Sequence, residues 1–200
     1  MKHPLHPVLA LLCACASGVA HAHSQEGLAG GFVSGVLHPV LGFDHLVAMV
    51  AVGLWGAQLG RPAVWALPIT FPTVMALGGL LGVLRVPLPM VEVGVAGSAI
   101  ALGMLVATCA RLSLPVAASI VAVFAIFHGH AHGAELPAAA NPLAYGVGFV
   151  LATGLLHLAG ILIGTLVHRP PGALLVRACG CGVALVGGWF LLAHAGVLGA

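Results

Sequence analysis

Six long apolar runs, separated by short loops, constrain this chain more than any other feature of its sequence. Each run is long enough to cross the roughly 30 Å hydrocarbon core of a bilayer, and a helix satisfies its own backbone polar groups in lipid. The chain has 200 residues, of which six are Lys or Arg and four are Asp or Glu. These are too few to cover the surface of a water-soluble domain. The sequence therefore predicts an all-α, polytopic membrane helix bundle with six full spans, roughly at residues 43–60, 63–84, 90–111, 114–134, 142–167 and 172–194.

The first 22 residues have the pattern of a secretory signal peptide. Lys2 gives the positive start, an apolar stretch follows, and Ala20-His21-Ala22 matches an A-x-A cleavage site. The alternatives are a first transmembrane helix, for which the apolar stretch is too short, and a lipoprotein-type cleavage before Cys15. We expect cleavage after Ala22, which makes residues 1–22 a signal peptide and residues 23–200 a single transmembrane helical domain that begins at His23.

A short apolar segment, Glu26–Leu37, precedes the first full span and is followed by Pro39. At 1.5 Å per residue it reaches about 18 Å, which is half a membrane. Because proline lacks a backbone donor, we expect a re-entrant half-helix or a strongly broken first helix. Arg61, Arg111 and Arg169 fall in alternate loops, which the positive-inside rule assigns to the cytoplasm. This topology predicts a bacterial inner-membrane protein with its mature N-terminus in the periplasm.

Small residues occur four apart in several runs, which lets helices approach closely. Such spacing is compatible with a compact bundle or with a homo-oligomer interface. The pairs are Gly31 and Gly35, Gly78 and Gly82, Gly129 and Gly133, and Gly160 and Gly164. The net charge of +2 without a basic cluster excludes nucleic acid as an expected partner.

The first group of candidate ligands is His38, Asp44 and His45, next to Pro39 and Gly42. A carboxylate beside a histidine at the start of a membrane span is costly unless it has a partner or a function. Two imidazoles and one carboxylate make a mixed N/O ligand set that suits nickel, cobalt, zinc or copper. The alternative is that Asp44 caps the following helix, but capping leaves His38 unexplained.

The second group lies at the end of the fourth run. His128 and His132 are four residues apart and Glu135 follows three later, so the three share one helix face. His130 points largely the other way and is expected to serve a second metal site or helix packing. The alternative is a histidine patch at the headgroup level. Glu92 is expected to form a surface pair with Arg85.

Two further histidines are candidate metal ligands. His157 lies in the middle of the fifth span, where it is either a relay ligand or a core histidine bonded to a backbone carbonyl. His23 would be the first residue after cleavage, so its imidazole and the freed α-amine could chelate an ion together.

The pattern H-x5-D-H from His38 to His45, with F-H-G-x-x-H-G-x-E from Phe127 to Glu135, resembles the HupE/UreJ family of nickel and cobalt permeases. Together with the signal peptide, the early histidine and the six spans, the resemblance covers essentially the whole chain. It implies metal uptake that supplies hydrogenase or urease maturation. The residues to which it assigns that role are His38, Asp44, His45, His128, His132 and Glu135. His130 fills a variable position of the motif.

These features predict high-affinity uptake of Ni²⁺, with Co²⁺ as the alternative cargo, across the inner membrane. The expected partners are the divalent ion and the lipid bilayer, with no prosthetic group and no enzymatic activity. The chain carries no G-x-x-x-x-G-K-[ST] loop, so we expect no ATP use by the chain itself. The main rival is an intramembrane zinc-dependent hydrolase, although no H-E-x-x-H motif is present. A metal sensor or a proton-conducting protein is a second rival.

Overall fold

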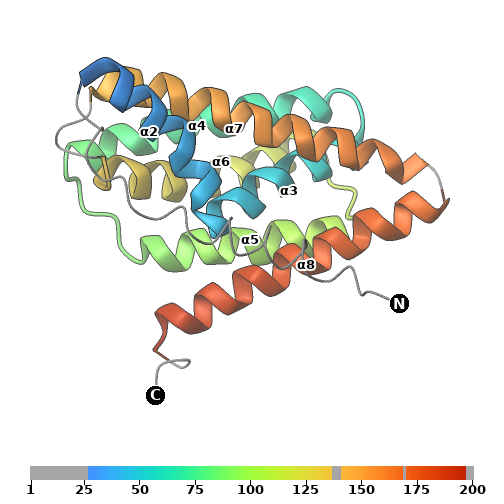
Figure 1. Cartoon of the computed structure of the whole chain (residues 1–200). Helices are drawn as coiled ribbons and strands as arrows, with labels where there is room; N and C mark the ends of the chain where they lie inside the picture. Colours follow the sequence, from blue (N-terminus) through green and yellow to red (C-terminus); the bar gives the residue numbers. More distant parts are fainter. Residues whose placement is uncertain (1–26, 137–140, 169, 197–200) are drawn as a thin grey trace, which may run out of the picture.

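The computed structural model describes residues 27–136, 141–168 and 170–196 (Figure 1). The predicted signal peptide and His23 lie outside these residues. All regular secondary structure in the described residues is helical. The helices in chain order are α2 (Gly27–Leu41), α3 (Phe43–Leu59), α4 (Ala63–Val83), α5 (Val91–Ala107), α6 (Leu114–Ala134), α7 (Pro142–Gly164), the 3-10 turn η1 (Thr165–His168) and α8 (Pro170–His194).

Helices α3 to α8 coincide with the six predicted apolar runs to within a few residues. By length and composition, α4, α6, α7 with η1, and α8 could each cross a membrane. The pair α2 and α3 passes the same test only when taken together, and α5 is a shorter apolar helix of 17 residues. The protein is thus an all-helical, multi-pass membrane protein with four or five candidate spans among the described residues.

The break near the first span lies at Gly42. Helix α2 continues through Pro39 to Leu41, so the break that was expected near the proline lies three residues after it. The chain leaves the helix at Gly42, whose φ of −75° and ψ of 96° are extended, and α3 then departs at 79° to α2. A bend of this size places His38 at the end of one helix and His45 in the first turns of the next, on the two arms of a corner.

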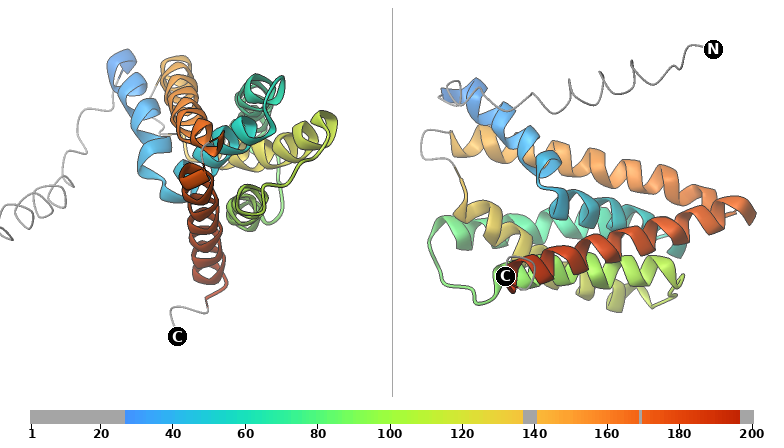
Figure 2. Two further views of the ribbon diagram at one scale, coloured as in Figure 1. Left: turned by 90° about the vertical axis from the view of Figure 1, so that its right-hand side faces the viewer. Right: turned by 60° about the horizontal axis from the view of Figure 1, so that its bottom comes forward.

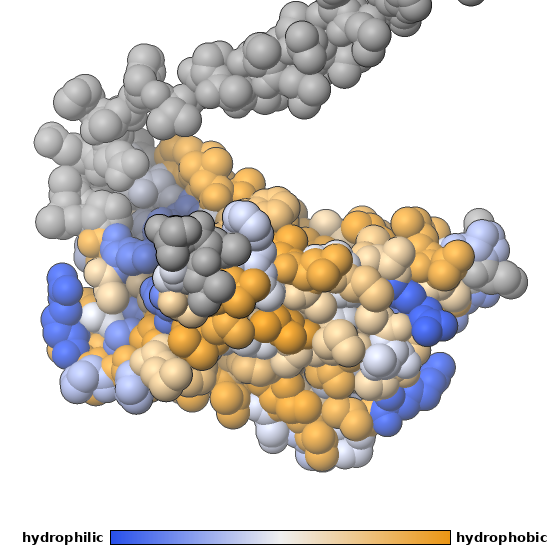
Figure 3. Space-filling model, turned by 90° about the horizontal axis from the view of Figure 1, so that it is seen from below, coloured by the Kyte–Doolittle hydropathy of each residue, from blue (hydrophilic) through white to orange (hydrophobic). Residues whose placement is uncertain are grey.

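Helix α3 forms the centre of the bundle, and most of its residues from His45 to Gln58 are buried. The helices around it bury one stripe and expose large apolar side chains on the other side, for example Ile69 and Leu185. Figure 2 shows α8 beside α5, and α2 beside α7, at the edges of the bundle. Figure 3 shows a mainly hydrophobic face with hydrophilic residues gathered at its two ends. This distribution fits a bundle whose middle lies in lipid.

The predicted glycine pairs lie at helix contacts. In the pairing of α4 with α6, a methyl group added to Gly78 would collide with the backbone of Ile126, and one added to Gly129 would collide with the backbone of Met75. Gly35 approaches α7 in the same way, and Gly160 approaches α3. The α4–α6 contact holds the histidines at the end of α6 against the rest of the bundle.

The two ends of the bundle carry different connections. One end, which we call the mouth end, holds the start of α2, the end of α8 and the α4–α5 and α6–α7 connections (Figure 1, left). The other, the far end, holds the α3–α4, α5–α6 and α7–α8 connections, with Arg61 and Arg111. The histidine motif of α6 belongs to the mouth end because it occupies the last two turns of that helix.

Candidate metal site

The two histidine motifs, about 90 residues apart in sequence, meet in the interior near the mouth end. The His45 ring is the centre of this contact, with its centroid 4.1 Å from that of His132 and 4.9 Å from that of His128. His38 also contacts His132, with ring centroids 4.8 Å apart. The corner between α2 and α3 therefore brings both of its histidines onto the predicted ligand face of α6.

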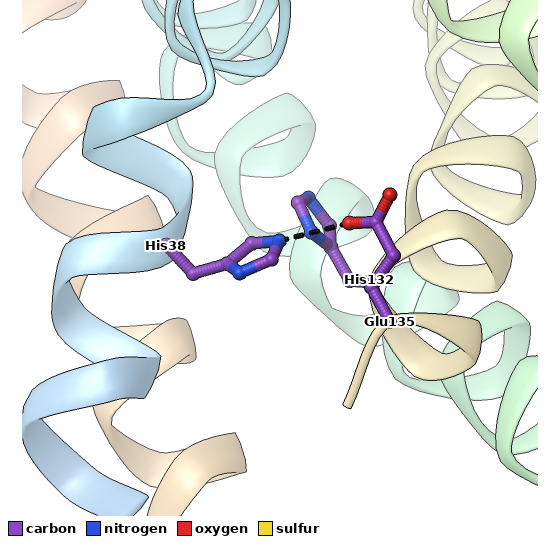
Figure 4. A group of neighbouring side chains, drawn as sticks. All are labelled: His38, His132 and Glu135. Carbon is purple, nitrogen blue, oxygen red and sulfur yellow. Dashed lines mark hydrogen bonds and ion pairs between the residues drawn. The ribbon is translucent and has the colours of Figure 1, made fainter. Parts of the chain in front are cut away.

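His38, His132 and Glu135 form a group whose ligand atoms all lie within 4.8 Å of one another. Figure 4 shows His38 reaching from α2 toward Glu135 and His132 of α6. The His38 Nε2 atom lies 3.1 Å from Glu135 Oε2. Adjacent ligands of an octahedral ion at about 2.1 Å are also about 3 Å apart, so a transition-metal ion could replace this contact with little movement of the two side chains.

Asp44 has two interactions in the first turn of α3. Its Oδ1 atom accepts the backbone N–H of His45 at 2.9 Å and lies 3.9 Å from His45 Nε2. The first interaction satisfies one of the free N–H groups of the helix start, although the N-cap position itself is held by Gly42 and Asp44 lies inside the first turn. The second places negative charge beside the imidazole at the centre of the cluster, so the carboxylate also faces the candidate site.

Several imidazole nitrogens of the cluster are buried without hydrogen-bond partners. His128 Nδ1 lies 2.9 Å from the carbonyl of Phe124; because a carbonyl can only accept, this nitrogen carries the proton and Nε2 is left with its lone pair. That Nε2 atom, both ring nitrogens of His132 and Nδ1 of His45 have no hydrogen-bond partner in the described residues. Buried polar groups are nearly always paired, so unpaired lone pairs gathered at one place fit a ligand that the chain itself does not supply.

A cavity of about 410 Å³ opens beside this cluster at the mouth end. We call it the mouth cavity, and its titratable lining consists of His38, Asp44, His45, Glu92, Glu135 and His194. Three of the four acidic residues in the whole sequence thus line one cavity. The exposed fraction of the side chain falls from 53% at Glu135 to 27% at His38, and His128 is fully buried. The site therefore changes from exposed carboxylates at the mouth to buried imidazoles in the interior.

Glu92 and His194 are mouth residues that the sequence patterns did not single out as ligands. The expected pair of Glu92 with Arg85 is wrong, because Glu92 Oε2 lies 3.4 Å from His194 Nε2. His194 is held by its own helix, since Nδ1 donates to the carbonyl of Phe190 at 2.8 Å. The predicted topology puts the start of α5 and the end of α8 at the same membrane face. It could therefore have indicated that Glu92 and His194 lie close together.

Two of the predicted ligands lie away from the cluster. His130 faces the α4–α5 connection, where Nε2 donates to the carbonyl of Val86 at 2.8 Å; its side chain points away from the cluster, as its spacing on α6 predicts. His157 is buried in α7, with its ring centroid 5.4 Å from that of Phe71. Phe71 also contacts His128 at 5.3 Å, so this aromatic ring connects His157 to the cluster.

The fold and the site together define a class: a multi-pass helical membrane protein with imidazoles and carboxylates gathered inside an apolar bundle. Comparison with known proteins makes the class specific. The family model described as HupE / UreJ protein matches residues 9–190, and this chain belongs to that family. It is similar to Protein HupE of Rhizobium leguminosarum bv. viciae, with 46% identity over 175 residues, or 87% of this chain and 91% of the relative. No solved structure matches the chain.

Proposed function

We propose that this protein takes up Ni²⁺, with Co²⁺ as the alternative cargo, across the bacterial inner membrane with high affinity and supplies it to hydrogenase or urease maturation. The observation that carries the proposal is the meeting of the two motifs, which brings His38, His45 and Glu135 to His132 inside an apolar bundle. Membership of the HupE/UreJ family supports the same conclusion.

The donor set suits a borderline divalent ion. Imidazole nitrogens with one or two carboxylate oxygens favour nickel, cobalt and zinc over magnesium or calcium, which prefer oxygen alone. The acidic mouth cavity raises the local concentration of cations. The ion would lose water in stages as it passes from exposed Glu135 to buried His45 and His128.

We further propose that the mouth end faces the periplasm and that six spans cross the membrane. Arg61 and Arg111 lie at the far end, as the positive-inside rule requires of a cytoplasmic end. Removal of residues 1–22 would leave a single transmembrane domain, 23–200, whose first residue His23 is only four positions before α2. In that position the new N-terminus could capture ions and deliver them to the mouth cavity.

The test is accumulation of radioactive nickel by cells that express the intact chain or an Asp44→Asn variant. Asparagine keeps an oxygen that can accept the N–H of His45 and removes the negative charge, so the variant separates capping from metal binding. We expect uptake to fall by about tenfold or more, at equal protein level in the membrane. His168→Ala is the matched control, because His168 lies at the far end in η1, and its uptake should equal that of the intact chain.

Full uptake by Asp44→Asn would restrict Asp44 to a capping role. If cells with the intact chain accumulate no more nickel or cobalt than cells without it, the uptake proposal is wrong. The rival zinc-dependent hydrolase would then remain, and it predicts turnover of a substrate without net accumulation of metal.

A further inference from the structure

One face of α7 runs from the histidine cluster toward the far end. Tyr145, Phe149, Thr153 and His157 follow one another at four-residue spacing and are all buried, so they form one stripe. Phe149 contacts the cluster, with its ring centroid 4.3 Å from that of His132. His157 lies two turns farther along, which is about 12 Å deeper in the bundle.

The two deeper members of this stripe carry polar atoms without partners. Thr153 is fully buried, and its hydroxyl has no hydrogen-bond partner in the described part of the chain. His157 is 1% exposed, and neither of its ring nitrogens makes a full hydrogen bond to a described residue. Buried polar side-chain atoms are nearly always paired. These two side chains lie one helical turn apart on α7, and their polar atoms are open to a ligand.

A backbone oxygen faces the same place. In a regular helix, the carbonyl of Pro68 would accept the N–H of residue 72, but residue 72 is a proline without an N–H. The Pro68 carbonyl lies close enough to the His157 ring to interact with it. Pro72 therefore removes the helical donor from a carbonyl oxygen that lies near His157.

Phe71 separates this inner group from the cluster at the mouth. Its ring is edge-on to both neighbours, at 67° to His128 and 84° to His157, and it is fully buried. Phe71 thus lies between the imidazole cluster of the mouth and the ring of His157.

We propose that His157, the hydroxyl of Thr153 and the backbone carbonyl of Pro68 form an inner coordination site for the transported divalent cation. The proposal rests on the uptake function above and adds a second site on the path. The inner site has one nitrogen and neutral oxygens, whereas the mouth has carboxylates. It would therefore hold the ion more weakly, which favours onward release toward the far end.

The experiment measures Co²⁺ binding to the purified chain in lipid nanodiscs, by visible absorption of the bound ion and by metal analysis. A mouth variant with alanine at His38, His45, His128 and His132 removes all four imidazoles of the cluster. We expect it to keep a weaker, saturable Co²⁺ site, and we expect addition of His157→Ala to abolish that site. Monodisperse elution and unchanged helical circular dichroism would establish that each variant is folded.

A matched pair at Thr153 tests the hydroxyl without a large change in packing. In the same mouth variant, Thr153→Ser keeps the hydroxyl and should bind Co²⁺ within about twofold of the parent, whereas Thr153→Val should bind about tenfold more weakly. Equal binding by the two proteins would overturn the assignment of the hydroxyl.

The two proposals fail in distinguishable ways. If the intact chain takes up nickel and binds Co²⁺ but the folded mouth variant binds none, the inner site is wrong and the uptake function stands. The inner site is equally wrong if residual Co²⁺ binding persists after His157 is removed. If the intact chain neither binds Co²⁺ nor accumulates nickel in cells, the uptake function itself is overturned.

Discussion

The two ends of the bundle use polar side chains differently. At the far end, polar side-chain donors bond to backbone carbonyls at the end of α5 and just after it, where a helix runs out of its own N–H donors. The bonds run from Gln58 Nε2 to Val106 at 2.9 Å, from Arg177 Nε to Ala107 at 2.9 Å and from Trp55 Nε1 to Ala110 at 3.0 Å. Gln58 Oε1 is left without a partner among the described residues, but each donor named here stabilises a helix end.

At the mouth end, the polar side chains face one another around a cavity instead. His132 uses neither ring nitrogen for a hydrogen bond to a described residue, and His45 Nδ1 is also free. The difference shows how an apolar bundle separates stability from function. Polar groups that stabilise the fold are paired with backbone, and polar groups that act on a substrate keep their lone pairs available.

The largest effect should follow from loss of a histidine at the centre of the mouth. His132 contacts both His38 and His45, and His132→Ala removes a nitrogen ligand from the proposed site. Loss of groups that only support a metal ligand costs 10–100-fold, so we expect nickel uptake to fall by about 100-fold or to background. Uptake of radioactive nickel by cells with equal amounts of membrane protein measures this.

His168→Ala at the far end is the comparison variant, and it should leave uptake unchanged. If His132→Ala and His168→Ala reduced nickel uptake equally, uptake would not depend on the position of the histidine. The proposed difference in function between the two ends would then be wrong.

Much of the site could be predicted from sequence because helical spacing determines it locally. His128, His132 and Glu135 share a face whatever surrounds them, and His130 faces elsewhere, toward Val86. The six apolar runs predicted helices within a few residues of those observed. Local pattern therefore predicted which residues lie together on each helix.

The rest depended on tertiary packing. The angle between α2 and α3 is set at Gly42, and sequence indicated only that a break was near. Pro39 stays helical because its missing N–H costs one bond in a helix that packs along α7. The partner of Glu92 is on α8, about 100 residues later, and no local spacing points to it.

The mouth cavity offers a smaller, purely electrostatic test. Glu92 lies in the cavity and pairs with His194, but it is outside the group of His38, His132 and Glu135. Glu92→Gln should raise the half-saturating nickel concentration by about tenfold, because a negative mouth speeds the arrival of cations. The maximal rate should change little, and the effect should shrink at high ionic strength.

Glu92→Asp keeps the charge and should stay close to the intact chain in the same assay. A loss of maximal rate that is independent of salt in Glu92→Gln would instead make Glu92 a direct ligand of the ion. The metal-binding cluster would then include a ligand from α5.

The smallest effect on uptake should come from the far end, where the expected loss is one of stability. Trp55→Phe keeps an aromatic ring in the core and removes the N–H that Ala110 accepts. Loss of a partly buried hydrogen bond costs about 1 kcal/mol, so the unfolding temperature of the purified protein in detergent should fall slightly. Nickel uptake per folded molecule should stay unchanged, because Trp55 is far along α3 from His45. Reduced uptake with an unchanged unfolding temperature would mean that Trp55 takes part in transport. The division between a stabilising end and a binding end would then be wrong.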